Sequence, residues 1–174
     1  MAPSHLKVGI LVEFSFEEPE LLYPYYRMKE AGYETVLIGP VAGKQYTGKH
    51  GYPVTSDVAI DNILAKDLCA LIIPGGWAPD YWRRDQRFLQ LVKDVDAQGK
   101  TLATICHGAW MLCSAKILQG RRLTCFCAVK DDVENAGGIY EDSAVVVDRN
   151  LVSSRIPSDL PDFCKAILAH LSSQ

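Results

Sequence analysis

The stretch TLATICHGAWML, residues 101–112, sits at the centre of this chain's chemistry. Residues 101–105 are apolar or threonine and predict a buried strand. Cys106 and His107 follow at a predicted sharp turn, where Gly108 relaxes the backbone before an apolar helix. This is the outline of a nucleophile elbow with cysteine in place of serine. Because free N–H groups at a helix start favour an anion, we expect the Cys106 thiol to lose its proton more easily than an ordinary thiol.

Strands and helices are predicted to alternate before this stretch. We expect strands over residues 6–12, 34–40 and 68–73 and a small hairpin over residues 42–57. Two helices are expected, over residues 17–31 and 80–98, and Gly32 and Gly99 end them.

After the elbow helix the pattern continues. We expect a short strand near residues 123–126 and a short helix near residues 130–137. A pair of strands, 144–147 and 151–153, is joined by a tight turn, and a last helix covers residues 159–171. Alternating strands and helices predict an α/β protein with a mostly parallel sheet covered on both faces.

Three loops follow the carboxyl ends of the predicted parallel strands, over residues 13–20, 74–80 and 106–108. Each carries polar residues or glycine, while the strands before them are mainly apolar. Since ligands bind outside the carboxyl ends of such strands, we expect the three loops to share one site.

The composition is that of one soluble globular domain. The 174 residues are 48% hydrophobic and 22% charged, with a net charge of −3, which does not favour nucleic-acid binding or an anionic membrane surface. No apolar stretch is long enough to span a membrane, and the opening residues 1–5 are not followed by a signal-peptide core. The six cysteines are interpreted as thiols of a cytoplasmic protein.

Cys106 is the predicted nucleophile because of its place at the turn, whereas Cys69 and the other cysteines in apolar segments are interpreted as core residues. His107 can reach the same pocket at a turn and could serve as acid or base. A third group would orient the imidazole, and Asp80 and Glu20 both remain candidates.

Glu17 and Glu20 lie at the end of the first strand. They could be ordinary carboxylates at a helix start, or one of them could lie close to the sulfur. A thiolate and a carboxylate that lie close together away from water repel each other strongly. One carboxyl would then keep its proton, and could donate a hydrogen bond to sulfur or transfer the proton to a substrate carbon.

Other residues have less specific interpretations. Gly75 and Gly76 could offer N–H groups to an oxyanion or form a plain turn, and no dinucleotide-binding glycine pattern is present. Lys49 could line a pocket or lie in a solvated loop. Cys125 and Cys127 lack a second pair at zinc-site spacing, so no metal is expected.

With these features together, the chain resembles the ThiJ/PfpI superfamily, and within it the PfpI-type intracellular protease and deglycase branch. The resemblance spans residues 6–171 and rests on six segments: 17–25, 47–51, 71–76, 105–108, 129–132 and 152–155. It implies a flavodoxin-like three-layer sandwich and a single ThiJ/PfpI-type domain, residues 1–174, of the class I glutamine amidotransferase-like kind.

The resemblance also implies roles for residues. Cys106 matches the nucleophile, with His107 beside it, and Glu20 matches the acid that contacts the sulfur. The pocket residues that match the family's substrate-binding positions are Glu17, Lys49, Gly75, Gly76 and Gly108. Asp80 matches an acidic residue that completes a triad from a neighbouring subunit, but it is one methylene shorter than the expected Glu. Phe126 stands where relatives place Tyr or His.

The first functional hypothesis is an enzyme that acts on 2-oxoaldehydes such as methylglyoxal or on their early adducts with proteins and nucleotides, like a glyoxalase III or deglycase. No cofactor or metal is expected, because the carbonyls are already electrophilic. The alternatives are a peptidase that uses Cys106, His107 and Asp80, and a redox-sensing stress protein with an oxidisable Cys106. The expected partners are a small aldehyde or a modified protein, and further copies of the chain in a homodimer or larger oligomer.

Overall fold

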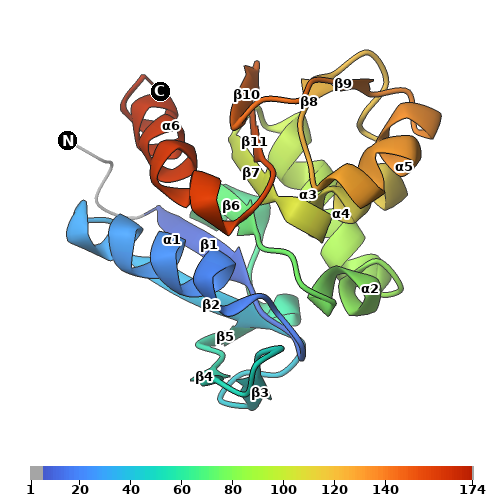
Figure 1. Cartoon of the computed structure of the whole chain (residues 1–174). Coiled ribbons are helices and arrows are strands. Elements are labelled where there is room, and N and C mark those ends of the chain that lie inside the picture. The colour runs from blue at the N-terminus through green and yellow to red at the C-terminus, as the bar shows by residue number, and fades with distance from the viewer. Residues whose placement is uncertain (1–5, 174) are drawn as a thin grey trace.

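A computed structural model describes residues 6–173; the opening segment, residues 1–5, which we compared with signal peptides, lies outside the described residues. The core is a seven-stranded sheet with helices on both faces (Figure 1). Along the sheet the strands run in the order β10 (Val145–Asp148), β11 (Leu151–Ser154), β7 (Thr101–Ile105), β6 (Leu68–Ile73), β1 (Lys7–Leu11), β2 (Thr35–Gly39) and β5 (Val58–Ala59).

Two small sheets lie outside the main one. They pair β3 (Gln45–Thr47) with β4 (Pro53–Thr55) and β8 (Arg122–Leu123) with β9 (Ile139–Tyr140). The helices are α1 (Glu18–Glu30), α2 (Ala78–Trp82), α3 (Gln86–Ala97), α4 (Ala109–Ala115), α5 (Lys130–Asn135) and α6 (Leu160–Ser172).

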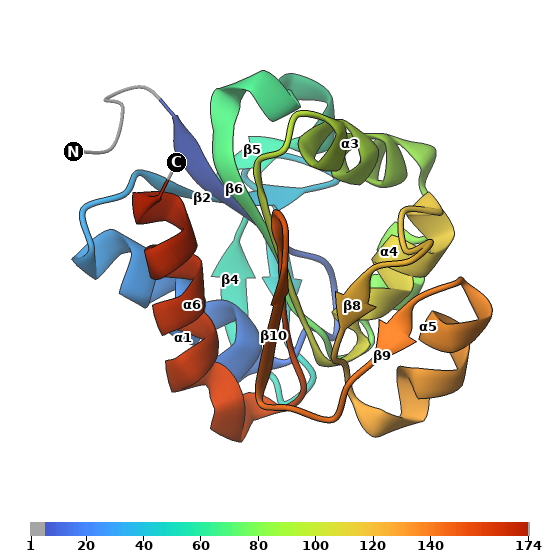
Figure 2. The ribbon, with the colours of Figure 1, turned by 90° about the horizontal axis from the view of Figure 1, so that it is seen from above.

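The layers form a three-layer sandwich, as the sequence predicted. Figure 2 shows the sheet nearly edge-on, with α1 and α6 on one face and α3, α4 and α5 on the other. All strand pairs of the main sheet are parallel except β10 with β11. Every residue of β6 and β7 is buried, as expected for central strands covered on both faces.

The predicted elements are found with two corrections. The prediction of a single helix over residues 80–98 is wrong, because the helix is interrupted at residues 83–85 and a new helix, α3, begins after them. Asp85 caps that start by accepting a hydrogen bond from the Arg87 N–H at 3.0 Å. Tyr81, expected on the buried stripe, is 44% exposed. In addition, strands β5 and β9 were not predicted.

The parallel strands place three loops at one edge of the sheet. The bridge between Phe16 and Gly76 and the hydrogen bond from Glu17 N to Gly75 O join the loops that follow β1 and β6. The loop that follows β7 lies against them, since a Cβ on Gly75 would be 3.0 Å from His107 N. The prediction of a shared edge is therefore confirmed. Within residues 6–173, no helix has the length and apolar character that crossing a membrane requires.

Candidate active site

The nucleophile elbow has the predicted form. Strand β7 ends at Ile105, the 3₁₀ turn Cys106–Gly108 follows, and α4 begins directly after it. Cys106 has a φ of 60°, a left-handed conformation that costs an L-residue energy and that is typical of functional turns. Gly108 is required here, since a Cβ would lie 2.5 Å from the carbonyl oxygen of Ile73.

Glu20 projects from the first turn of α1 into the buried floor of the site, where its exposed fraction is 0%. Its Oε2 accepts the Gly75 N–H at 2.7 Å, and Oε1 has no hydrogen-bond partner by geometry within residues 6–173. Burial raises the pKa of Glu20 to about 7; the charge of Glu17 adds to this shift and the Gly75 N–H opposes it. A carboxyl with this pKa can give and take protons near neutral pH.

The Cys106 thiol lies beside this carboxyl. A Cβ built on Gly75 would be 2.6 Å from Glu20 Oε2 and 2.8 Å from Cys106 Cβ. Burial, and then the charge of Glu20, raises the pKa of the thiol. The expectation of an acidified thiol is therefore wrong in direction. The reason is that the pattern of residues 101–112 shows the helix start but not how deeply Cys106 is buried; the residue is 8% exposed.

Cys106 and Glu20 thus form a buried pair of acids, and ionisation of one strongly disfavours ionisation of the other, so the pair carries at most one negative charge. The sulfur can become nucleophilic by passing its proton to the Glu20 carboxylate as it attacks. The proton then stays inside the site and is available for the next step.

His107 reaches the same sulfur, as predicted, with its Nδ1 3.2 Å from Cys106 Sγ. Burial, and then the charge of Lys49, lowers the pKa of the imidazole, so His107 is neutral at neutral pH. Three aromatic rings surround it, with centroid distances of 5.4 Å to Trp77, 4.9 Å to Trp110 and 5.1 Å to Phe126.

A small cavity of about 180 Å³ opens above the sulfur. Glu17 and Lys49 form an ion pair at its rim, with 3.2 Å between Oε2 and Nζ. The residues that line the cavity are Glu17, Glu20, Lys49, Gly76, Trp77, Cys106, His107, Phe126, Ile156 and Pro157.

The loop that carries Lys49 is anchored by Glu18. This carboxylate, with 8% of the residue exposed, accepts the backbone N–H of His50 and lies 2.8 Å from His50 Nδ1. A Cβ on Gly48 would lie 2.5 Å from Glu18 Oε1, so a larger residue there would displace the carboxylate that holds the loop. Although burial alone would raise it, hydrogen bonds from His50 hold the pKa of Glu18 below its ordinary value.

Glu17, Glu18 and His50 also bring three possible metal-ligating atoms within 4.8 Å of one another. Lys49 already binds the Glu17 carboxylate, and His50 already binds that of Glu18. Because an ammonium group occupies this position, the arrangement favours an internal ion-pair cluster over a cation site.

Asp80 lies outside this arrangement within a single chain. It sits on α2, with its side chain 56% exposed, and forms an ion pair with Arg84 at 3.0 Å. It is not among the residues that line the cavity. A triad in which Asp80 reaches the His107 of a neighbouring copy therefore stays a prediction.

The structure brings together Cys106, His107, Glu20, Glu17, Lys49 and both glycines of the 75–76 loop, with Gly108 beneath the turn. Sequence reasoning missed Trp77, Ile156 and Pro157. Trp77 follows Gly76 directly, and that adjacency was the signal that could have found it. No pattern marked Ile156 or Pro157.

These features define an α/β protein with a cysteine elbow and a buried carboxyl group beside the thiol. The DJ-1/PfpI family model matches residues 6–170, and this chain belongs to that family.

Similar proteins and solved structures agree with this family assignment. The chain is 44% identical to a deglycase of Pyrococcus abyssi over 155 residues, which cover 89% of this chain and 93% of that one. It is 40% identical to protein/nucleic acid deglycase 2 of Escherichia coli over 169 residues, covering 96% and 98%. A two-domain protein of Anabaena variabilis, with DJ-1/ThiJ/PfpI-like and ferritin-like domains, superposes with a TM-score of 0.94 at 39% identity, covering 96% of this chain and 48% of that one.

Proposed function

We propose that this protein is a cofactor-independent cysteine enzyme that acts on 2-oxoaldehydes such as methylglyoxal, or on their early adducts with proteins and nucleotides. The observation that carries the proposal is the buried Glu20 carboxyl, with a pKa of about 7, beside the Cys106 thiol. Relatives of about 40% identity that are named deglycases support enzyme activity of this general type.

The first step is addition of the thiol to the aldehyde carbon. Cys106 Sγ forms a bond to C1, the C1=O π bond breaks, and Glu20 takes the thiol proton. The oxygen of C1 becomes a hydroxyl by accepting that proton back. The product is a hemithioacetal with an intact ketone at C2.

The second step moves hydrogen between the two carbons. Glu20 or neutral His107 removes the proton from C1, and the electron pair forms an enediol as the C2 oxygen is protonated. A proton then returns to C2 while the C1 hydroxyl gives up its own proton to Glu20 or His107 and becomes a carbonyl, which gives a 2-hydroxy thioester. The electrons stay within the substrate, so C1 is oxidised as C2 is reduced.

The last step is hydrolysis of the thioester. Water adds to C1, the C–S bond breaks, and the sulfur recovers its proton. Methylglyoxal plus water therefore yields lactate and regenerates the enzyme. The N–H of Gly76 lies among the groups around the sulfur and can donate a hydrogen bond to a developing oxyanion.

The test is production of lactate from methylglyoxal by protein treated with a chelator. We expect Cys106→Ala to lower kcat/KM by at least about 10³-fold. Cys127→Ala, which removes an exposed thiol that is not part of the cavity lining, is the matched control and should keep the wild-type rate. Equal rates for wild type and Cys106→Ala would exclude this mechanism.

A peptidase is the second candidate, because the 3.2 Å approach of His107 Nδ1 to Cys106 Sγ is also the pairing of a cysteine protease. This proposal needs a homo-oligomer in which Asp80 of one copy faces His107 of another. Hydrolysis of a fluorogenic peptide that fell in Asp80→Asn but not in Arg84→Gln would support it. A structure of the assembled protein with Asp80 far from every His107 would count against it.

Redox sensing is the third candidate, favoured by the buried Glu20 carboxyl beside Cys106, which could donate a hydrogen bond to a Cys106 sulfinate. Two equivalents of peroxide would convert the thiol to the sulfinate and release water. Mass spectrometry after mild peroxide treatment would distinguish oxygen uptake at Cys106 from uptake scattered over the six cysteines.

A further inference from the structure

One wall of the cavity is aromatic and has no role in the steps above. Trp77 stands at the rim with half of its surface exposed, and its ring centroid is 5.4 Å from that of His107. Phe126 stacks on His107 at 5.1 Å with an interplanar angle of 27°. Both rings line the cavity above Cys106.

Trp77 is held firmly despite its exposure. The backbone N–H of Trp77 donates to the backbone carbonyl of Ser15 at 2.8 Å, directly beside the bridge between Phe16 and Gly76. Gly76 has a φ of 74°, and a Cβ there would lie 2.5 Å from both Glu17 N and Ser15 O. The backbone that carries the indole is therefore fixed against the loop after β1, so the indole does not depend on a flexible segment for its position.

The charges at the rim already neutralise each other. Lys49 pairs with Glu17 at 3.2 Å, and the same ammonium lies 5.8 Å from the Trp77 ring centroid. A substrate with a charged tail would have to break this pair before it gained a partner. The rim thus favours a neutral group.

The cavity has room for such a group. The reacting carbon must lie at the floor, against Cys106 and Glu20, so the substituent at C2 points toward the rim. The volume of about 180 Å³ exceeds the roughly 150 Å³ known to accept a benzene ring in a protein interior. Aromatic pairs at offset-stacked or edge-on geometry add binding energy beyond their buried area.

We propose that Trp77, together with Phe126, selects 2-oxoaldehydes whose C2 substituent is an aromatic ring, so that phenylglyoxal is preferred to methylglyoxal. Trp77 is a specificity-determining residue that stacks on the substituent. This inference rests on the proposed function, but it concerns the choice among substrates and not the reaction.

The experiment compares kcat/KM for phenylglyoxal, read as mandelate, with kcat/KM for methylglyoxal, read as lactate. We expect the wild type to prefer phenylglyoxal, and Trp77→Ala to lower the ratio of the two values about tenfold, mainly through a higher KM for phenylglyoxal. Trp77→Phe keeps an aromatic face and should hold the ratio within about threefold. Tyr81→Ala removes an exposed ring on α2 that is not in the cavity lining, and should leave the ratio unchanged.

A second measurement needs no variant, should Trp77→Ala fail to fold. Cyclohexylglyoxal matches phenylglyoxal in size but lacks a π face, and the wild type should process it about fivefold less well. Equal values for the two, or a parallel fall of both substrates in a folded Trp77→Ala, would overturn the inference while the proposed function stood. Absence of any product from either aldehyde would overturn the proposed function itself.

Discussion

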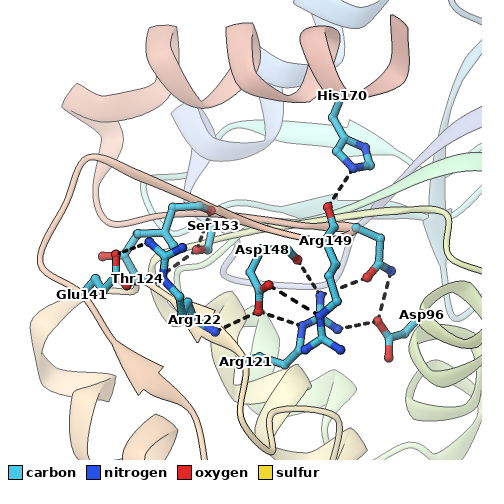
Figure 3. Close-up of polar contacts among 11 residues, drawn as sticks. Asp96, Arg121, Arg122, Thr124, Glu141, Asp148, Arg149, Ser153 and His170 are labelled. Carbon is cyan, nitrogen blue, oxygen red and sulfur yellow. Dashed lines mark hydrogen bonds and ion pairs between the residues drawn. The ribbon is translucent and has the colours of Figure 1, made fainter. Parts of the chain in front are cut away.

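The two ends of strand β7 treat polar groups in opposite ways. At its amino end, beyond Thr101, a buried Arg121 binds Asp96 at 3.0 Å and Asp148 at 3.3 Å, and Asn150 joins them (Figure 3). The Arg121 side chain is only 6% exposed, yet it donates to four different oxygen atoms. His170, nearby on α6, lies 2.9 Å from the carbonyl of Arg149 and 2.8 Å from Thr101 Oγ1.

At the carboxyl end, polar groups are buried without such partners. Glu20 Oε1 and the hydroxyls of Thr104 and Thr124 have no hydrogen-bond partner within residues 6–173. Burial raises the pKa values of Glu20 and Cys106 there. The difference teaches that buried polar groups with hydrogen-bond partners stabilise the sheet, whereas buried polar groups without a full set of partners are available for reaction.

The largest expected effect tests the reactive end. Glu20→Gln keeps the shape and can still accept the Gly75 N–H, but it cannot take the thiol proton. We expect kcat/KM for methylglyoxal to fall by about 10³-fold. The free energy of unfolding at pH 7 should rise, because a group that resists ionisation is replaced by a neutral one. A less stable Glu20→Gln protein would contradict the comparison.

The satisfied end should show the reverse. Arg121→Ala removes four hydrogen bonds at once, including those to the partly buried carboxylates of Asp96 and Asp148, so the free energy of unfolding should fall by about 3 to 4 kcal/mol. Urea denaturation measures this loss, and activity per folded molecule should stay near wild type. The neighbouring Arg122, whose side chain is 54% exposed, provides the control: Arg122→Ala should cost less than about 1 kcal/mol.

The pH dependence sharpens the same contrast. The folded protein keeps Glu20 protonated up to a pKa of about 7, whereas the unfolded carboxyl ionises near 4.5. The stabilising contribution of Glu20 is therefore full below pH 4.5 and is lost as the pH rises to 7. The stability advantage of Glu20→Gln over wild type should accordingly grow by about 3 kcal/mol across this range. A constant difference between the two unfolding curves would refute the assignment.

The smallest expected effect compares two hydroxyls that face each other on paired strands. Thr104 and Ser153 are register partners of β7 and β11; Thr104 Oγ1 has no partner among the described residues, while Ser153 Oγ accepts the Thr124 N–H and donates to Val146 O. Thr104→Val should change the free energy of unfolding by less than about 1 kcal/mol, whereas Ser153→Ala should cost about 1 to 2 kcal/mol. Thermal unfolding of the two variants decides the matter, and equal losses would argue against the distinction.

Much of this architecture could be predicted from residue patterns. The run of buried residues in β7, the turn at Cys106 and the glycine stops after α1 and α3 are local signals, and local signals determine where elements begin and end. The break before Asp85 was missed because the apolar spacing continues across it, while the cap at Asp85 shows only as a single acidic residue.

The electrostatics could not be predicted in the same way. The helix start beside Cys106 is visible in sequence and favours a thiolate, but the burial that opposes it depends on packing by distant segments. Glu20 lies 86 positions before Cys106, and no spacing rule shows that its carboxyl reaches the sulfur. Trp77 was missed for a related reason, since its orientation depends on the bridge from Phe16.

The anchoring of the 47–52 loop by Glu18 makes the β3–β4 hairpin a unit that could be exchanged. The hairpin lies outside the main sheet and supplies Lys49 to the pocket, and the carboxylate on α1 holds its loop in place. Chimaeras that import a relative's hairpin should keep their geometry only when position 18 travels with it. Protein engineers who wish to recast the pocket therefore have a cassette of one helix residue and one hairpin, and can leave the elbow untouched.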